Sequence, residues 1–299
     1  MTKEITDFFK MNDVKYKENY RLSLISPIKI GGQARYVAYP NTNVSLVGVV
    51  NFLQKNKIKY KILGRMSNVL PPDKIFDGVI IRTDRISQIS LIDSCLEADA
   101  GASLPFLAKI TADTGLSGLE ELSGIPGSIG GAVRGNAGAF GREISHMISS
   151  VTIYDCTSFT IEQLSYDQID FGYRYSSLMR DDIVILSVRL TLSPSDSVSI
   201  KALIQQCRER RIATQPVGQA SLGSTFKRPA KDISAAKLID DCGLKGKGMG
   251  GAKISEKHAG FIVNCGGATA ADYLRLADYA KNKVFEKFGI NLEREIEVI

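Results

Sequence analysis

A glycine-rich stretch at residues 123–141 constrains this chain most strongly, because seven glycines are interleaved there with apolar residues. A flexible linker would be polar and rich in Gly and Ser, whereas the Ile, Val, Ala and Phe residues of this stretch can pack on a core. Glycine permits positive φ and close approach to a ligand, and backbone N–H groups without side chains in front can form an anion cradle. We therefore predict a shaped loop that holds a pyrophosphate. The alternative is a tight loop packed on a sheet without a ligand.

A second glycine motif is not interpreted as a dinucleotide site. Gly246, Gly248 and Gly251 form a literal G-x-G-x-x-G, but no apolar strand precedes them and no amphipathic helix pattern follows. The dinucleotide fingerprint requires that strand–turn–helix setting. The sequence also contains no Walker A pattern.

Length and composition exclude several classes of protein. A chain of 299 residues predicts two or three domains, and the contents of 44% hydrophobic and 23% charged residues are those of a soluble globular protein. No apolar run has the length of a membrane span, and residues 1–25 lack a signal-peptide core, so we expect a cytoplasmic protein. The five cysteines form no C-x-x-C pair, which favours reduced thiols over metal or disulfide roles. A net charge of +6 does not argue strongly for nucleic acid and also suits a small anionic substrate.

The pattern of apolar residues and breakers predicts an α+β fold that is rich in strands. Two strands are expected around Gly31 and Gly32, and the last ten residues are expected to form a strand with glutamates at 293, 295 and 297 on one face. We place predicted domains at residues 1–70, 71–194 and 195–299. Predicted helices cover residues 46–53, 104–114, 193–212, 234–242 and 270–288, and further predicted strands cover residues 60–64, 78–82, 89–92, 95–100, 151–155, 183–192 and 261–264.

Four clusters could carry chemistry: residues 64–68, the glycine-rich stretch, residues 173–176 and residues 223–229. Each side chain has an ordinary interpretation when taken alone. Arg174 would be a surface or ion-paired arginine, Ser224 a turn serine, Glu295 a solvated carboxylate and His258 a structural histidine. The sequence does not spell out a nucleophile–base–acid triad.

Taken together, the clusters resemble the shorter form of the UDP-N-acetylenolpyruvoylglucosamine reductases. The resemblance runs from about residue 26 to the C-terminus, and the combination of motifs is specific although each motif alone is not. It implies an FAD-binding domain of the vanillyl-alcohol oxidase and p-cresol methylhydroxylase type, built from two α+β subdomains, and a C-terminal α+β substrate domain. The motifs are GIPGSIGGA from Gly124, NAGAFG from Asn136, YRYS from Tyr173, GSTFK from Gly223 and KHAGFIVN from Lys257.

The resemblance implies FAD as cofactor and NADPH as the reductant that reduces the flavin and then leaves. The pyrophosphate of FAD would lie against residues 64–68 and 124–131, with residues 136–141 near the flavin. The family usually has a second glycine where Met66 stands. The implied cofactor contacts are Gly64, Ser67, Asn68, Gly124, Pro126, Gly127, Ser128, Gly130, Gly131, Asn136, Ala137, Gly138 and Gly141.

The resemblance also implies the catalytic groups. Arg174 would neutralise charge that develops on the substrate carboxylate, Glu295 would assist it, and Ser224 would deliver the proton. Arg228 stands where the family usually has asparagine. The implied substrate contacts are Tyr173, Lys227, Arg228, His258 and Asn264.

The expected protein is a cytoplasmic, monomeric, FAD-dependent and NADPH-consuming enzyme that makes UDP-N-acetylmuramate for peptidoglycan. We expect no resident metal and no membrane or nucleic-acid partner. Two alternatives stay open at this point. One is a flavin oxidase of the same superfamily that acts on another substrate, and the other is a non-catalytic protein that binds UDP-sugars.

Overall fold

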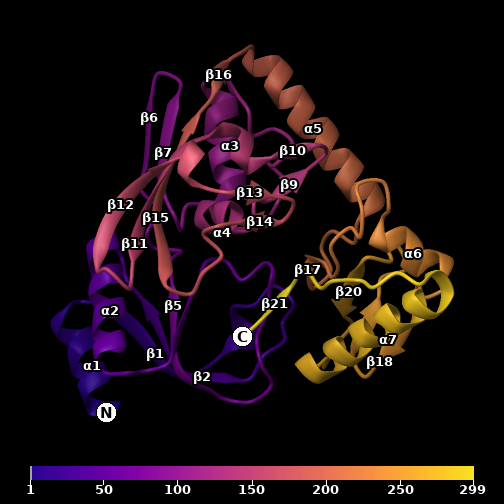
Figure 1. Ribbon diagram of the computed structural model, residues 1–299, viewed down its shortest axis with the longest axis horizontal. Coiled ribbons are helices and arrows are strands. Elements are labelled where there is room, and N and C mark those ends of the chain that lie inside the picture. Colours follow the sequence, from indigo (N-terminus) through magenta and orange to yellow (C-terminus); the bar gives the residue numbers. More distant parts are fainter. Residues whose placement is uncertain (1) are drawn as a thin grey trace. The chain divides into compact units, whose positions relative to one another are not determined.

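The computed structural model describes residues 2–299, which divide into two compact units (Figure 1). Unit 1 contains the described residues up to Glu18 together with Tyr36–Arg65 and Gly78–Glu209. Unit 2 contains Asn19–Arg35, Met66–Asp77 and Arg210–Ile299. Both units are therefore discontinuous in sequence. The division at residues 70 and 194 was drawn along the sequence and stays a prediction.

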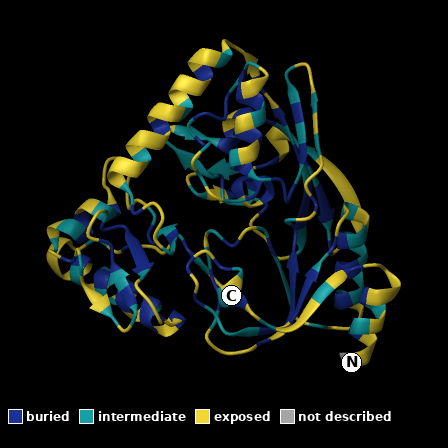
Figure 2. Ribbon diagram, turned by 180° about the vertical axis from the view of Figure 1, so that it is seen from behind, coloured by how far each residue is buried: buried dark blue, intermediate teal, exposed yellow. Residues whose placement is uncertain are grey.

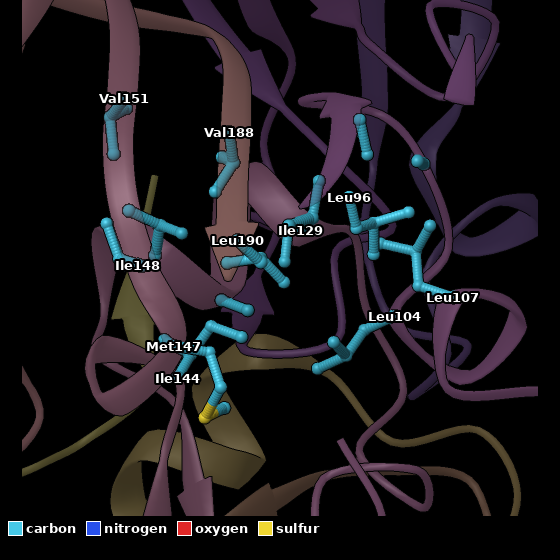
Figure 3. Close-up of a cluster of buried hydrophobic side chains, with 14 of the residues drawn as sticks. Leu96, Leu104, Leu107, Ile129, Ile144, Met147, Ile148, Val151, Val188 and Leu190 are labelled. Atoms are coloured by element: carbon cyan, nitrogen blue, oxygen red, sulfur yellow. The ribbon is translucent and has the colours of Figure 1, made fainter. Parts of the chain in front are cut away.

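Unit 1 contains a five-stranded antiparallel sheet in the order β12-β11-β15-β7-β6 (Figure 1). Its strands are β6 (Ile89–Ile92), β7 (Cys95–Asp99), β11 (Ile148–Asp155), β12 (Thr160–Ser165) and β15 (Ile183–Thr191). Helices α3 (Leu104–Asp113) and α4 (Ile129–Arg134) contribute to the same core. Figure 3 shows that core, in which Ile129 of α4 lies beside Leu190 of β15 and Leu96 of β7. The glycine-rich stretch is thus anchored by its own apolar residues.

A second sheet of unit 1 has the order β1-β2-β5-β3, formed by β1 (Lys15–Arg21), β2 (Gln33–Tyr39), β3 (Tyr60–Leu63) and β5 (Phe76–Arg82). Strands β3 and β5 are parallel, with Tyr60 opposite Val79. Helix α1 (Thr2–Met11) and helix α2 (Asn43–Lys55) pack beside it. The four apolar residues that predicted α2, Leu46, Val49, Val50 and Leu53, are all fully buried, as their helical spacing requires.

The shorter elements complete the chain. Helix α5 (Ser197–Thr214) buries only Ile200 and Cys207 and is coloured mostly as exposed in Figure 2. The remaining short strands are β4 (Val69–Leu70), β8 (Leu116–Ser117), β9 (Gly138–Ala139), β10 (Arg142–Glu143), β13 (Phe171–Gly172), β14 (Tyr175–Ser176) and β16 (Ser193–Pro194), and the 3-10 helices are η1 (Leu22–Leu24), η2 (Ile144–Met147) and η3 (Tyr166–Gln168).

Unit 2 is built on an antiparallel sheet of order β17-β20-β19-β18, formed by β17 (Ser221–Ser224), β18 (Gly248–Met249), β19 (Ala252–Ile254) and β20 (Phe261–Asn264). Helices α6 (Ala235–Asp241) and α7 (Ala270–Phe288) share its core. Gly289 ends α7 in a left-handed conformation with a φ of 68°, which is the usual role of glycine at the end of a helix. The G-x-G-x-x-G residues lie in and beside the β18–β19 hairpin, which differs from the strand–turn–helix setting of a dinucleotide fingerprint.

The N-terminus of α7 is fixed by a residue that is distant in sequence. Thr269 and Asp272 form a capping box, and hydrogen bonds from Thr269 lower the pKa of Asp272. The carboxylate of Asp73 also accepts the N–H groups of Ala270 at 2.7 Å and Ala271 at 2.9 Å. A negative charge is favourable at this end of a helix. Residues 66–77 are thereby attached to the C-terminal part of unit 2.

Two predicted strands are wrong in part. Residues 28–32 form no strand, because Lys29 has a φ of 57° and Gly31 a φ of 132°, and such left-handed values interrupt an extended chain. At the C-terminus only β21 (Glu297–Val298) is a strand, paired in parallel with β4. Strands β1 and β12 were not predicted.

The part of the chain that the structure describes contains neither a membrane-spanning helix nor a metal-binding cluster. No helix in residues 2–299 has the length and the apolar character that crossing a membrane requires. The same residues contain no group of three or more His, Cys, Asp or Glu side chains arranged to hold a metal ion.

Replacing Gly130 by alanine should destabilise unit 1 by about 1–3 kcal/mol through overpacking. An added Cβ would lie 2.7 Å from the Ala100 Cβ and 3.0 Å from the Ala100 carbonyl oxygen. The matched control is Gly48→Ala in α2, where an added Cβ meets nothing within 4 Å and the substitution should stabilise by up to about 1 kcal/mol. Urea unfolding of both variants measures the difference. Equal stability of the two would show that Gly130 is not a close contact.

Candidate active site

The glycine-rich stretch runs beside residues 100–104 of unit 1. Ser128 and Ser103 form a β-bridge, and the N–H groups of Ile129 and Gly130 donate to the carbonyl oxygens of Ala102 and Ala100, both at 2.9 Å. The expectation that this stretch exposes an uninterrupted run of N–H groups is therefore wrong at these two residues. The exposed residues of its first part are Gly124, Pro126 and Gly131.

Ser128 joins the two segments that were predicted to hold the pyrophosphate. It caps α4, and its buried hydroxyl accepts the N–H of Gly131 at 3.4 Å. A Cβ added to Gly64 would lie 2.3 Å from the Ser128 Oγ. Gly64 and the start of α4 can approach this closely only because Gly64 has no side chain. The lack of side chains at Gly64 and Gly131 around Ser128 fits a backbone surface against which a phosphate group packs.

Residues 136–143 form a tight hairpin. Strands β9 and β10 pair Ala139 with Arg142, and the two turn residues Phe140 and Gly141 have φ values of 51° and 88°. Positive φ at both positions defines a type I′ turn, which normally takes Asn-Gly. Ala137 ties the hairpin to α4, since its N–H donates to the Ala132 carbonyl at 2.8 Å. A Cβ added to Gly141 meets nothing within 4 Å, so the tip is open.

Arg174 stands at the turn of the β13–β14 hairpin. Gly172 pairs with Tyr175, so Tyr173 and Arg174 are the two turn residues, and Arg174 has a left-handed φ of 54°. Its guanidinium donates to the Gly138 carbonyl at 2.9 Å and lies 5.2 Å from the centre of the Tyr173 ring. The predicted catalytic arginine and the predicted flavin segment are thus in contact within unit 1.

Ser224 and Glu295 belong to two segments of unit 2 that run side by side. The Glu295 N–H donates to the Thr225 carbonyl at 2.9 Å, and Phe226 and Arg294 form a β-bridge. Asn68 contacts the same segment, where its amide donates to the Glu295 carbonyl at 2.9 Å. Two predicted catalytic residues and one predicted cofactor residue are therefore neighbours in space although more than 200 positions separate Asn68 from Glu295.

The basic residues after Ser224 have partners of their own. The ammonium group of Lys227 lies 2.6 Å from a carboxylate oxygen of Glu293, and the exposed Arg228 donates to the Lys231 carbonyl at 3.4 Å. Thr225 is buried, and its hydroxyl lies 2.9 Å from that of Tyr273. Burial raises the pKa of Tyr273, which keeps it neutral. The Thr225–Tyr273 contact fixes the strand end that carries Ser224.

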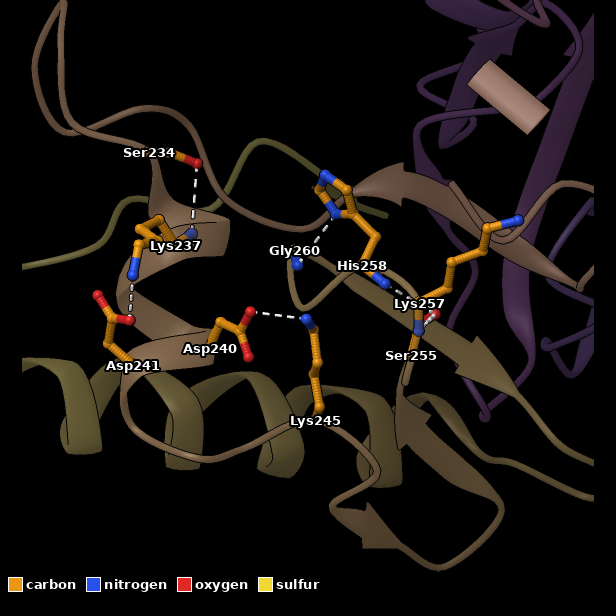
Figure 4. Close-up of polar contacts among 9 residues, drawn as sticks. All are labelled: Ser234, Lys237, Asp240, Asp241, Lys245, Ser255, Lys257, His258 and Gly260. Carbon is orange, nitrogen blue, oxygen red and sulfur yellow. Dashed lines mark hydrogen bonds and ion pairs between the residues drawn. The ribbon is translucent and has the colours of Figure 1, made fainter. Parts of the chain in front are cut away.

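His258 and Asn264 have structural contacts in unit 2 (Figure 4 shows those of His258). The Nδ1 atom of His258 accepts the Gly260 N–H at 3.2 Å, and its ring meets the Phe261 ring edge-on. The Asn264 amide donates to the Ile28 carbonyl at 2.9 Å, while its oxygen accepts the N–H of Gly266. Both side chains hold loops of unit 2, whichever other contacts they make.

Met66 occupies the position of the expected glycine in a glycine-like conformation. Its φ is 57°, and its side chain is only 3% exposed. A left-handed residue other than glycine costs roughly 1 kcal/mol. The burial of its side chain within unit 2 compensates for that cost.

The geometry agrees with comparisons to known proteins. Residues 34–162 match the FAD binding domain family, and residues 215–299 match the C-terminal domain of UDP-N-acetylenolpyruvoylglucosamine reductase. The UDP-N-acetylenolpyruvoylglucosamine reductase of Lactiplantibacillus plantarum is 37% identical over all of this chain and 98% of its own. The chain belongs to the UDP-N-acetylenolpyruvoylglucosamine reductase family. The reductase of Clostridium botulinum is 41% identical over 91% of this chain and 88% of its own.

The solved structures agree with this membership. The crystal structure of UDP-N-acetylenolpyruvylglucosamine reductase from Thermus caldophilus covers 95% of this chain and 98% of its own, with a TM-score of 0.79 and 31% identity. The family resemblance, the FAD-binding domain and the α+β fold class predicted from the sequence are thereby confirmed.

Sequence reasoning missed three residues whose side chains fix the backbone or the predicted site residues of this chain. Asp73 caps α7, Glu143 accepts from the amide of Asn136, and Tyr273 contacts Thr225. None stands in one of the quoted motifs, and each acts on a residue far away in the sequence or through a turn. A single sequence carries no signal for such contacts.

We expect His258 to make this reductase less stable in mild acid. Burial lowers the pKa of His258 below its ordinary value. In mild acid the unfolded chain therefore binds a proton at His258 that the folded chain does not bind. Stability is therefore lost as the pH falls from about 6.5 towards the lowered pKa. Urea unfolding at about pH 7.5 and 5.5 should show a smaller loss in His258→Gln than in the wild type. The exposed His146 supplies the control variant His146→Gln, and an equal loss in both variants would contradict the prediction.

Proposed function

We propose that this protein reduces the enolpyruvyl ether of UDP-N-acetylglucosamine to UDP-N-acetylmuramate, with FAD as cofactor and NADPH as reductant. The observation that supports the proposal is the backbone pairing of the segments that carry Ser224 and Glu295 in unit 2, since the proposed proton donor and its assisting carboxyl group belong to neighbouring segments. Membership of the reductase family supports the substrate. We also propose that the protein is a monomer, that it works in the cytoplasm and that its substrate is a small anion.

Gly64, Ser128 and Gly131 of unit 1 would hold the pyrophosphate of FAD, and Asn68 is a further proposed cofactor contact. When bound, FAD supplies hydride chemistry that no side chain can provide. The other proposed cofactor contacts are Ser67, Gly124, Pro126, Gly127, Gly130, Asn136, Ala137, Gly138 and Gly141. The proposed substrate contacts are Tyr173, Lys227, Arg228, His258 and Asn264.

The chain's own residues would stabilise the charge that develops on the substrate. Addition of hydride to the vinyl group leaves an enolate-like carbon next to the carboxylate, and Arg174 would neutralise the extra charge on the carboxylate oxygens. Glu295 can assist only when it is protonated or hydrogen-bonded to that carboxylate, since two bare carboxylates repel each other. Ser224 would then donate its hydroxyl proton to the carbon. The strongly basic acceptor makes so weak an acid sufficient.

The test is the visible spectrum of the purified protein under anaerobic conditions. The flavin band should bleach on addition of NADPH and return on addition of enolpyruvyl-UDP-N-acetylglucosamine. UDP-N-acetylglucosamine, which has no vinyl group, is the control and should restore nothing. A protein that stays colourless even after incubation with FAD, but still binds the UDP-sugar, would overturn the proposal in favour of a binding protein. Formation of peroxide from another substrate would favour an oxidase.

A further inference from the structure

The side chain of Asn136 is enclosed in unit 1 and fully hydrogen-bonded there. Asn136 is 1% exposed. Its amide nitrogen donates to the Gly172 carbonyl at 2.9 Å and to a carboxylate oxygen of Glu143 at 3.0 Å, and its amide oxygen accepts the Ser145 N–H at 3.3 Å. Both hydrogens of the amide are therefore taken. A contact of Asn136 with the flavin has to come from its backbone.

The bonds of Asn136 lead to Arg174 from two directions. Gly172 immediately precedes the turn formed by Tyr173 and Arg174. The guanidinium of Arg174 returns to the Gly138 carbonyl, two residues beyond Asn136. The side chains of Asn136 and Arg174 thus form two cross-links between residues 136–138 and residues 172–174.

Arg174 needs such support because its backbone is strained. Its φ of 54° lies in the left-handed region, which costs roughly 1 kcal/mol for a residue other than glycine. The hydroxyl of Ser176 donates to the Arg134 carbonyl at 2.7 Å and fixes the other strand of the hairpin to the end of α4. The bond from Asn136 to Gly172 fixes the strand that enters the turn.

Glu143, the Gly172 carbonyl and the Ser145 N–H together determine which way the amide of Asn136 faces. An ionised carboxylate only accepts hydrogen bonds, so it draws the amide nitrogen of Asn136 towards itself and towards the Gly172 carbonyl. The amide oxygen is then left to face the Ser145 N–H. With the amide reversed, oxygen would face two acceptors and nitrogen would face a donor. The carboxylate is itself held, because Glu143 takes part in a capping box at η2.

We propose that Asn136 and Glu143 are positioning residues that hold the guanidinium of Arg174 in its working place. The inference rests on the proposed function, in which Arg174 stabilises the substrate carboxylate. It assigns Asn136 a task that acts through Arg174 and leaves hydride transfer from NADPH untouched.

The test measures the two half-reactions separately by anaerobic stopped-flow absorbance. Asn136→Asp keeps the size of the side chain and replaces the two amide donors by an acceptor beside Glu143. It should slow flavin reoxidation by the enolpyruvyl substrate by about 10- to 100-fold, the usual result of a misplaced catalytic group, with flavin reduction by NADPH within about twofold of the wild type. Asn56→Asp is the matched control, because the Asn56 amide donates to the Phe52 carbonyl in α2, and it should change neither rate.

A double-mutant cycle with Arg174→Ala separates the inference from the proposed function. If Asn136 acts through Arg174, Asn136→Asp should have no further effect on reoxidation in the Arg174→Ala background. If Arg174→Ala slows reoxidation and Asn136→Asp slows it by the same factor in both backgrounds, the positioning role is wrong. If Arg174→Ala alone leaves reoxidation at the wild-type rate, the proposed function of Arg174 is wrong instead.

A second variant keeps the test decisive if Asn136→Asp fails to fold or to retain FAD. Glu143→Gln keeps an acceptor oxygen and should reoxidise at nearly the wild-type rate, whereas Glu143→Ala removes one of the two acceptors that hold the Asn136 amide and should slow reoxidation. The same cycle with Arg174→Ala applies to Glu143→Ala. Equal reoxidation rates in the two Glu143 variants would overturn the positioning role of Glu143.

Discussion

Replacing Ser224 by alanine should leave flavin reduction by NADPH intact and slow reoxidation by the enolpyruvyl substrate by about 10²–10⁴-fold, the usual contribution of a general acid. The hydroxyl is the group proposed to protonate the substrate carbon, and it takes no part in the reduction of the flavin. Anaerobic stopped-flow absorbance measures both rates on one preparation.

Ser221→Ala is the matched control for this prediction. Ser221 lies on the same strand, β17, and pairs with Val263 of β20 as Ser224 pairs with Phe261. Its loss should leave both half-reactions near the wild-type rates. The assignment of Ser224 fails if its alanine variant reoxidises as fast as the Ser221 variant.

The second large effect is expected from Gly64→Ala, which should weaken FAD binding by roughly 5- to 150-fold, equivalent to 1–3 kcal/mol of overpacking. The added methyl group would lie 2.3 Å from the Ser128 Oγ and would push the cap of α4 away from Gly64. Fluorescence titration of the apoprotein with FAD measures the affinity.

A compensating change tests the cause of that loss. Ser128→Ala removes the hydroxyl that the new methyl group meets, so part of the loss should be recovered: Gly64→Ala should weaken FAD binding by a smaller factor in the Ser128→Ala background than in the wild type. The remaining contact is milder, since the Ser128 Cβ lies 3.3 Å from the added atom. If the second substitution brings no recovery, the steric account of Gly64 is incorrect.

The long helices and the buried strands could be predicted from the sequence because their signals are local. Helix α7 has apolar spacing, a Thr269 cap and a terminal Gly289, and α2 buries all four of its periodic residues. The glycine-rich stretch was predicted to be a shaped loop packed on a core. Its Ile129 is fully buried, but the prediction of a loop is wrong for Ile129–Arg134, which form helix α4.

The rest of the site depends on contacts that no local pattern encodes. The N–H groups of Ile129 and Gly130 bond to the Ala100–Ala102 segment, which a reading of glycines alone cannot foresee. The C-terminal strand is shortened because Glu293 and Glu295 bond to the segment after Ser224 instead of forming one long ladder. The motifs identified the candidate residues, but hydrogen bonds between segments distant in sequence determine the conformation of their backbones.

The contact of the Asp73 carboxylate with the start of α7 determines whether a C-terminal fragment of this protein can be produced alone. A fragment that begins near residue 210 would lack Asp73 and would leave Ala270 and Ala271 without their acceptor. It would also lack Ile28, Ile30 and Leu70, which are buried in the same core as α7. Such a fragment exposes apolar surface and leaves two N–H groups at the start of α7 without their acceptor, so it should aggregate when produced alone. Dividing the gene near residue 210 would therefore separate segments of unit 2 that we expect to fold only together.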